Sequence, residues 1–205
     1  MPSIDARPVA ILLAAGGGHR FQGNTHKLLT PVAGPGGDRR SVVEHALRAV
    51  IASDIGPVVV VSGAVDLADT LATVTADVVE RSITAIEHDG WAAGQASSLA
   101  VGVRTAIDLG ATSVVVGLGD QPGITPAAWR RVASAAQPIA VATYDGRRGN
   151  PVRLASDVWP LLPTEGDEGA RSLMRLRPDL VGEVACDGSA FDIDTLEDLA
   201  RWQNS

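Results

Sequence analysis

The 205-residue sequence contains one cysteine, Cys186, and few aromatic side chains, which make up 3% of the chain. A single cysteine excludes a small scaffold that is held together by disulfides. The longest apolar runs, Pro8–Ala15 and Pro57–Val61, are far shorter than the roughly 20 residues that span a bilayer. No basic segment followed by an apolar one opens the chain, so nothing marks it for export. We therefore expect a globular cytoplasmic protein with no membrane partner.

Positive charge is also scarce, because 17 lysines and arginines face 24 aspartates and glutamates and the formal net charge is −7. Binding of nucleic acid needs basic faces and stacking aromatic side chains, so this composition argues against a nucleic-acid partner. Hydrophobic residues make up 45% of the chain, which is enough for a core at this length. We expect a single domain over residues 1–205 and, since no second domain or long exposed apolar helix is indicated, a monomer.

Apolar, β-branched runs alternate with helical patterns along the chain. Strands are expected at Val9–Leu13, Val58–Val61, Ile83–Ile86, Ser113–Leu118, Ile139–Thr143 and Val181–Ala185. Helices are expected at Ser41–Ile51, Ala64–Ala72, Ser97–Leu109, Pro126–Ala136, Asp157–Leu162, Gly169–Leu176 and Thr195–Gln203. Several strands are apolar on both faces, which is typical of a parallel sheet covered on both sides. The sequence thus predicts an α/β fold with a doubly wound, mostly parallel sheet, helices on both faces, and ligands beyond the carboxyl ends of the strands.

The loop after the first expected strand is the most informative segment. Its three glycines, Gly16–Gly18, carry no Cβ, so backbone N–H groups can surround an anion where the strand ends. Arg20 and Lys27 follow and can reach a phosphate. The loop is not a dinucleotide fingerprint, because Phe21 stands where the third glycine would be, and it lacks the Gly-Lys-Ser/Thr of a P-loop. The structural alternative is a glycine turn that carries solvated basic residues.

Five motifs occur in order along the chain. They are Leu13-Ala14-Ala15-Gly16 with Arg20-Phe21 and Lys27-Leu28-Leu29, Gly94-Gln95-Ala96-Ser97-Ser98-Leu99, Gly117-Leu118-Gly119-Asp120-Gln121-Pro122, Gly149-Asn150-Pro151, and Asp192-Ile193-Asp194-Thr195-Leu196-Glu197-Asp198-Leu199. Together they resemble the MobA-like nucleotidyltransferases, the family that contains the molybdenum cofactor cytidylyl- and guanylyltransferases. The chain departs from the family pattern where Leu196 replaces a proline and where Arg20 and Lys27 lie slightly farther apart than usual. The resemblance implies a Rossmann-type fold like that of the nucleotide-diphospho-sugar transferases.

Nucleotidyl transfer needs an anchor for a triphosphate, a divalent metal and an aligned nucleophilic phosphate. The resemblance implies that Lys27 anchors the triphosphate and that Arg20 neutralises the departing pyrophosphate. The residues expected to bind the nucleotide are Leu13, Ala14, Ala15, Gly16, Gly17, Gly18, Lys27, Ser97 and Ser98. Asp120 directly follows an apolar strand and is expected to take part in catalysis as a ligand of Mg²⁺. The alternative for Asp120 is a turn-forming residue before Gln121-Pro122.

Two acids of the closing motif compete for the place of a second metal ligand, and the resemblance slightly favours Asp194 over Asp192. The alternative is that Asp194 or Thr195 caps the last helix. Ser97 and Ser98 are likewise either nucleotide ligands or helix N-caps. Asn150 is either a turn residue or, by resemblance, part of the acceptor side of the cleft.

Histidine, tryptophan and cysteine add little further expected chemistry. His19 lies inside the glycine loop and can touch a phosphate, but His26, His45 and His88 form no metal-ligand spacing with it. The four tryptophans are expected to pack, mostly on helix faces. No nucleophilic role is expected for Cys186, and no Gly-x-Ser-x-Gly elbow indicates a serine hydrolase.

The resemblance implies an Mg²⁺-dependent enzyme that transfers CMP from CTP to molybdopterin or its molybdenum form, a phosphorylated pterin, and releases pyrophosphate. CTP is expected because Leu-Ala-Ala-Gly accompanies the cytidylyltransferases and Leu-Ala-Gly-Gly the guanylyltransferases. The methyl group of Ala15 also leaves less room for a purine. One alternative is a non-catalytic accessory protein that delivers the cofactor to a molybdenum hydroxylase. Another is an NAD(P)H oxidoreductase of the nicotine blue type, which Phe21 disfavours.

Overall fold

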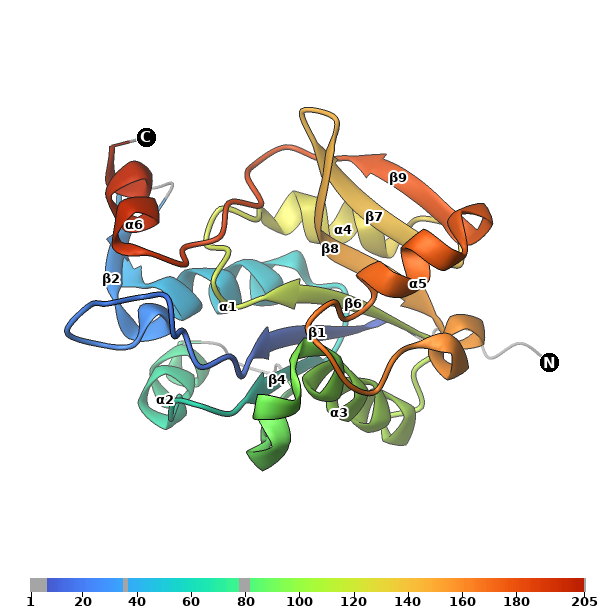
Figure 1. The fold of residues 1–205 in the computed structure, drawn as a ribbon, viewed down its shortest axis with the longest axis horizontal. Coiled ribbons are helices and arrows are strands. Elements are labelled where there is room, and N and C mark those ends of the chain that lie inside the picture. The colour runs from blue at the N-terminus through green and yellow to red at the C-terminus, as the bar shows by residue number, and fades with distance from the viewer. Residues whose placement is uncertain (1–6, 35–36, 78–81, 205) are drawn as a thin grey trace.

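A single seven-stranded sheet forms the centre of the molecule, in the order β5-β4-β1-β6-β8-β7-β9 (Figure 1). The computed structural model describes residues 7–34, 37–77 and 82–204. The strands are β1 (Val9–Ala14), β4 (Val58–Ser62), β5 (Ile83–Glu87), β6 (Ser113–Leu118), β7 (Ile139–Tyr144), β8 (Arg147–Ala155) and β9 (Val181–Ala185). All six expected strands are present within one residue of their predicted bounds. The prediction of a mostly parallel α/β sheet is confirmed.

Strand β8 was not expected, and it runs antiparallel to both of its neighbours, β6 and β7. Asp145 and Gly146 both have positive φ and reverse the chain directly after β7, so that β8 pairs back along it. The alternative in which Asn150 is a turn residue is therefore wrong, because Gly149-Asn150-Pro151 lies within β8. The register with β7 shifts there, which suits a proline that has no N–H to donate to the ladder.

Helices cover both faces of the sheet. One face packs against α1 (Val42–Ser53), α2 (Ala68–Ala76) and α4 (Pro126–Ala133), and the other against α3 (Gln95–Asp108), the 3₁₀ helix η3 (Ser156–Leu161) and α5 (Arg171–Leu176). Side chains of β1 alternate between the two cores, with Leu12 on the first and Leu13 on the second. The expected helices Ala64–Ala72 and Asp157–Leu162 differ in that α2 begins at Ala68 and η3 is a 3₁₀ helix that contains Pro160.

A small accessory layer brings the end of the chain back toward its beginning. The short strands β2 (Pro31–Ala33) and β3 (Arg39–Ser41) pair antiparallel, and α6 (Leu196–Gln203) lies beside β2, far from the preceding strand β9 (Figure 1). Val32, Val42 and Ile193 form the buried core of this layer. Because of this return, the segment before α6 passes over the carboxyl ends of β1 and β6.

Three further 3₁₀ helices lie in the connections, namely η1 (Lys27–Leu29), η2 (Asp89–Ala93) and η4 (Pro178–Leu180). Among the residues that the structure describes, no helix combines the length and the apolar composition that a membrane crossing requires.

Candidate functional site

The site forms where β1 and β6 end side by side. Leu13 of β1 pairs with Leu118 of β6, and the N–H of Gly119 donates to the carbonyl of Leu13 at 2.8 Å. The glycine loop and Asp120 therefore leave the sheet at the same edge. The segment before α6 reaches this edge because the N–H of Ile193 donates to the carbonyl of Asp120 at 3.0 Å.

Four charged residues that the sequence motifs singled out meet at this edge. Lys27 Nζ lies 2.6 Å from Asp120 Oδ2 and 2.6 Å from Asp194 Oδ1, and Arg20 Nη2 lies 2.6 Å from Asp194 Oδ2. Lys27 is the single lysine of the chain, and its side chain is only 10% exposed. Burial lowers the pKa of Lys27, but the charges and hydrogen bonds of the two carboxylates outweigh burial and raise that pKa above its ordinary value. Lys27 is therefore an ammonium cation at neutral pH.

His26 fixes Lys27 relative to the glycine loop. It caps η1, where its Nδ1 accepts from the N–H of Leu28 at 3.3 Å, while its Nε2 lies 3.2 Å from the carbonyl of Gly16. Burial is the main cause that lowers the pKa of His26, which favours the neutral ring with Nε2 as the donor to Gly16. Gly18 has φ +60, a conformation that favours glycine and turns the loop toward η1. The sequence motifs assigned no role to His26.

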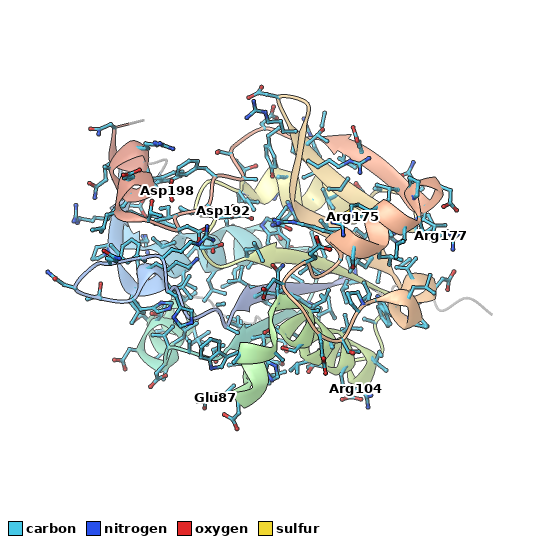
Figure 2. The ribbon with its side chains drawn as sticks, viewed as in Figure 1. Glu87, Arg104, Arg175, Arg177, Asp192 and Asp198 are labelled. Carbon is cyan, nitrogen blue, oxygen red and sulfur yellow. The ribbon has the colours of Figure 1, made fainter. Side chains whose placement is uncertain are left out.

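The acids at the strand ends have distinct environments. Asp120 Oδ1 is buried and has no hydrogen-bond partner among the described residues. Asp192 Oδ1 accepts from Gln121 Nε2 at 2.6 Å, and burial, followed by the charge of Asp120, raises the pKa of Asp192 to about 6. Thr195 caps α6 in a capping box with Asp198, so Asp194 is left to contact Lys27 and Arg20. Figure 2 shows Asp192 on the segment that leads to α6 and Asp198 within that helix.

A cavity of about 680 Å³ opens above these charges. Its lining residues are Leu13, Ala15, Gly16, Gly17, His19, Arg20, Lys27, Trp91, Ala92, Gly94, Gln95, Ser98, Leu118, Asp120, Asp167, Arg171, Asp192 and Asp194. We call it the donor cavity. Most of the residues expected to bind the nucleotide line it, but Ala14, Gly18 and Ser97 do not. The Ser97 hydroxyl instead donates to the carbonyl of Gly94 at 2.8 Å and lies 3.0 Å from His88 Nε2.

The two serines are not N-caps, which corrects the alternative in which they capped a helix. α3 begins at Gln95 and its N-cap is Gly94, because the helix starts two residues earlier than expected. Ser98 faces the donor cavity together with Gln95, which lies three residues before it on the same helix face.

Another cavity, of about 280 Å³, adjoins the donor cavity, and Asn150 is one of its lining residues. We call it the second cavity. Asn150 Nδ2 donates to Gln121 Oε1 at 3.0 Å, and Gln121 is buried, with its amide also bonded to Asp192. The residue expected on the acceptor side thus lines the second cavity, and the buried Gln121 links it by hydrogen bonds to Asp192 of the donor cavity.

Several lining residues could not be recognised from the sequence motifs. Trp91, expected to pack, lies in η2 and lines the donor cavity, with its ring 6.1 Å from that of His19. Gln95 stands in a motif that pointed to its serines, while Asp167 and Arg171 lie in a segment that carries none of the five motifs. Cys186 lines neither cavity, and burial raises the pKa of its thiol.

No group of three or more His, Cys, Asp and Glu side chains in the described part of the chain is arranged to hold a metal. Asp120 and Asp194 are the two acids joined by the Lys27 ammonium. A cation bound by them would need its remaining ligands from a substrate or from water.

Comparison with solved structures shows the same fold in nucleotidyltransferases. Rv0371c from Mycobacterium tuberculosis H37Rv is 27% identical with a TM-score of 0.76, and the match covers 97% of this chain and 98% of that one. A nucleotidyl transferase from Methanothermobacter thermautotroptrophicus is 23% identical with a TM-score of 0.77, over 97% and 96% of the two chains, and shows the fold alone. The fold is that of the nucleotide-diphospho-sugar transferases, as expected.

The purine catabolism protein PucB of Bacillus subtilis is a more similar sequence over a shorter stretch. It is 36% identical over 110 residues, which are 51% of this chain and 54% of PucB, so the match spans about half of each protein. The MobA-like NTP transferase domain family matches residues 10–199, nearly the whole chain. With its glycine loop, Lys27 and strand-end Asp120 at one edge of the sheet, the chain belongs to the MobA-like NTP transferase domain family.

Proposed function

We propose that the protein is an Mg²⁺-dependent nucleotidyltransferase that transfers CMP from CTP to molybdopterin, or to its molybdenum form, and releases pyrophosphate. The observation that carries this proposal is the Lys27 ammonium, held by Asp120 and Asp194 at the base of the donor cavity beside the glycine loop. Family membership supports the reaction type. The choice of CTP and of a phosphorylated pterin rests on the motifs that resemble the cytidylyltransferases.

The residues present fit a divalent cation. Asp120 Oδ1 is buried without a partner among the described residues, and the carboxylate of Asp194 is 22% exposed toward the same cavity. Two carboxylates, completed by phosphate oxygens and water, are the usual protein contribution to an Mg²⁺ site. When bound, such an ion supplies positive charge to the phosphate oxygens. A structural relative, Rv0371c from Mycobacterium tuberculosis, 26% identical with a TM-score of 0.72, has been solved as a complex with manganese, which supports a divalent metal.

The basic residues of the site act on the triphosphate. In the proposed reaction an oxygen of the acceptor phosphate forms a bond to the α-phosphorus of CTP. The bond from that phosphorus to the α,β-bridging oxygen breaks, and pyrophosphate leaves with the electron pair. Lys27 would anchor the triphosphate, and Arg20, at the exposed mouth of the cavity, would neutralise the charge of the leaving pyrophosphate.

The position of Ala15 favours a pyrimidine over a purine as the base of the nucleotide. The residue is buried, at 4% exposure, and lines the cavity next to Gly16. A methyl group at this position takes space that a glycine would leave to a purine. One such contact is worth about 1–3 kcal/mol, so the preference for CTP over GTP is expected to be modest.

The experiment that tests the proposal measures pyrophosphate release from CTP with molybdopterin and Mg²⁺. We expect Asp120→Asn to abolish turnover with an unchanged circular dichroism spectrum, because the amide cannot replace a carboxylate toward a cation. The matched control is Asp179→Asn, an exposed residue that pairs with Arg177 outside both cavities, and it should retain full activity. Full activity of the Asp120 variant would refute the assignment.

The similarity to PucB favours a second candidate, since that relative is named for purine catabolism. Under this candidate the chain binds the molybdenum cofactor and delivers it to a molybdenum hydroxylase without nucleotidyl transfer. Tight binding of molybdopterin by the wild-type protein, together with no pyrophosphate release from CTP, GTP, ATP or UTP, would favour it. A thermal-shift panel of these nucleotides includes NADPH as a further ligand. Absence of stabilisation by NADPH would exclude the oxidoreductase alternative.

A further inference from the structure

The donor cavity and the second cavity share three lining residues, Leu13, Gln95 and Arg171. Leu13 is apolar and Gln95 is neutral, so Arg171 supplies the only charge common to both described linings. Arg171 therefore stands at the junction between the pocket of the acids and the pocket of Asn150.

The side chain of Arg171 is exposed and has no partner among the described residues. It forms no hydrogen bond or ion pair with them, whereas the other arginines around the cavities are paired. Arg148 Nε lies 2.8 Å from Glu183, Arg175 contacts both carboxylate oxygens of Glu168, and Arg20 contacts Asp194. An exposed, unpaired guanidinium between two cavities is available to a ligand.

The segment that carries Arg171 is fixed against the start of α3. The N–H of Gly166 donates to the carbonyl of Ala93, and the N–H of Ala96 donates to the carbonyl of Gly166, both at 2.9 Å. Gly94 has φ +100, and a Cβ there would lie 2.5 Å from the backbone of Gly166, so the two segments touch. The N–H of Arg171 itself donates to the carbonyl of Glu168 at 2.9 Å. Backbone hydrogen bonds therefore hold the segment of Arg171 in place at the junction of the two cavities.

The second cavity has the composition of a site for an anion with an apolar body. Leu99, Val116, Val141 and Met174 contribute apolar surface. Because Arg175 pairs with Glu168 and Arg148 pairs with Glu183, the positive charge left for an anion in this lining is that of Arg171. A guanidinium donates two parallel hydrogen bonds to a phosphate, which fixes both its position and its orientation.

We propose that Arg171 binds the phosphate of the acceptor at this junction and holds it toward the α-phosphorus of the nucleotide in the donor cavity. The acceptor class is a phosphate monoester whose less polar part lies against the apolar side chains of the second cavity. This inference rests on the proposed function, because it needs a nucleotide in the donor cavity. It assigns a role to a residue for which the motifs gave none.

The first test does not depend on the identity of the acceptor. The donor cavity is saturated with Mg²⁺ and the α,β-methylene analogue of whichever triphosphate stabilises the protein most, and inorganic phosphate is titrated by calorimetry. We expect Arg171→Gln to weaken phosphate binding about 10- to 100-fold, the effect of losing a charge-assisted pair, and Arg171→Lys to weaken it less. Arg177→Gln is the matched control, because Arg177 pairs with Asp179 and lies far from Asp192 (Figure 2). Thermal melting shows that each variant is folded.

Equal phosphate affinity in wild type and Arg171→Gln would overturn the proposal, and so would a wild type that binds no phosphate at millimolar concentrations. The second test follows turnover with CTP and molybdopterin. There, Arg171→Gln should raise the KM for molybdopterin by about the same factor and leave the KM for CTP unchanged. If the wild type releases no pyrophosphate with molybdopterin, the proposed function fails, while the phosphate titration still decides the role of Arg171.

Discussion

Replacement of Lys27 by methionine removes the cation between Asp120 and Asp194 and keeps a side chain of similar length. At an effective dielectric constant of about 20, each contact at 2.6 Å is worth roughly 6 kcal/mol before the cost of desolvation is subtracted. Removing one partner of a buried pair costs about 3–5 kcal/mol, because the remaining charge stays buried. The carboxylates are 17% and 22% exposed, so we expect a loss near the lower end, about 3 kcal/mol at pH 8.

The loss of stability in the Lys27→Met variant should depend on pH. The raised pKa of Lys27 means that its contribution is fully present below the ordinary lysine pKa and is lost only as the pH rises through its higher value in the folded protein. In the methionine variant Asp194 keeps its contact with Arg20, but the cation between the two neighbouring carboxylates is gone, so the folded pair binds a proton more readily than it does in the wild type. The folded variant then holds a proton that the unfolded chain lacks, and this stabilisation disappears as the pH rises. The difference between wild type and variant should therefore be larger at pH 8 than at pH 5.

Urea unfolding in the presence of EDTA at both pH values measures this difference. Arg104→Met is the matched control, since Arg104 is exposed on α3, lines neither cavity and forms no ion pair with the described residues (Figure 2). A loss below about 1 kcal/mol for the Lys27 variant, the scale of an exposed pair, would refute the reasoning, as would a gap that does not widen with pH. Because Lys27 is the only lysine, reductive methylation with ¹³C-formaldehyde also labels it alone besides the N-terminus. Its NMR signal should titrate above an ordinary lysine.

Two further predictions concern the donor base and the cysteine. Ala15→Gly should lower the ratio of kcat/KM for CTP over GTP by about tenfold or more, and a wild type that already prefers GTP would contradict the role of Ala15. Burial raises the pKa of Cys186, so its thiol should react with iodoacetamide more slowly than glutathione at pH 7 and accelerate only at higher pH; a rate equal to that of glutathione would contradict this placement.

The parallel part of the sheet could be predicted because its strands are buried on both faces and their β-branched runs differ clearly from the helical segments. Strand β8 was missed because Asn150 and Pro151 sit at an irregularity where the pairing with β7 shifts, so the segment does not read as a regular strand. The signal that could have found β8 is Asp145-Gly146, a dipeptide that favours a two-residue hairpin directly after a strong strand.

In the site, the local motifs pointed to the charged residues but not to their neighbours. Lys27 lies 93 residues from Asp120 and 167 from Asp194 in the sequence. The register of β1 with β6 brings the glycine loop beside Asp120, and the hydrogen bond from Ile193 to Asp120 brings in the segment of Asp194. Ser97 and Ser98 looked equivalent in the sequence, yet adjacent residues of a helix point about 100° apart, so one serine faces the cavity and the other faces His88. Gln95 could have been found only after the start of α3 was known.

The charges of the donor cavity bear on which candidate function fits. Its described lining holds four carboxylates, from Asp120, Asp167, Asp192 and Asp194, against three cations, from Arg20, Lys27 and Arg171. A site built only to hold an anionic cofactor gains nothing from an excess of acids, because each one repels the ligand. One divalent cation bound by these acids would change the net charge of the lining from −1 to +1. The lining would then attract a triphosphate. The composition of this cavity therefore favours metal-dependent nucleotidyl transfer over delivery of a bound cofactor without chemistry.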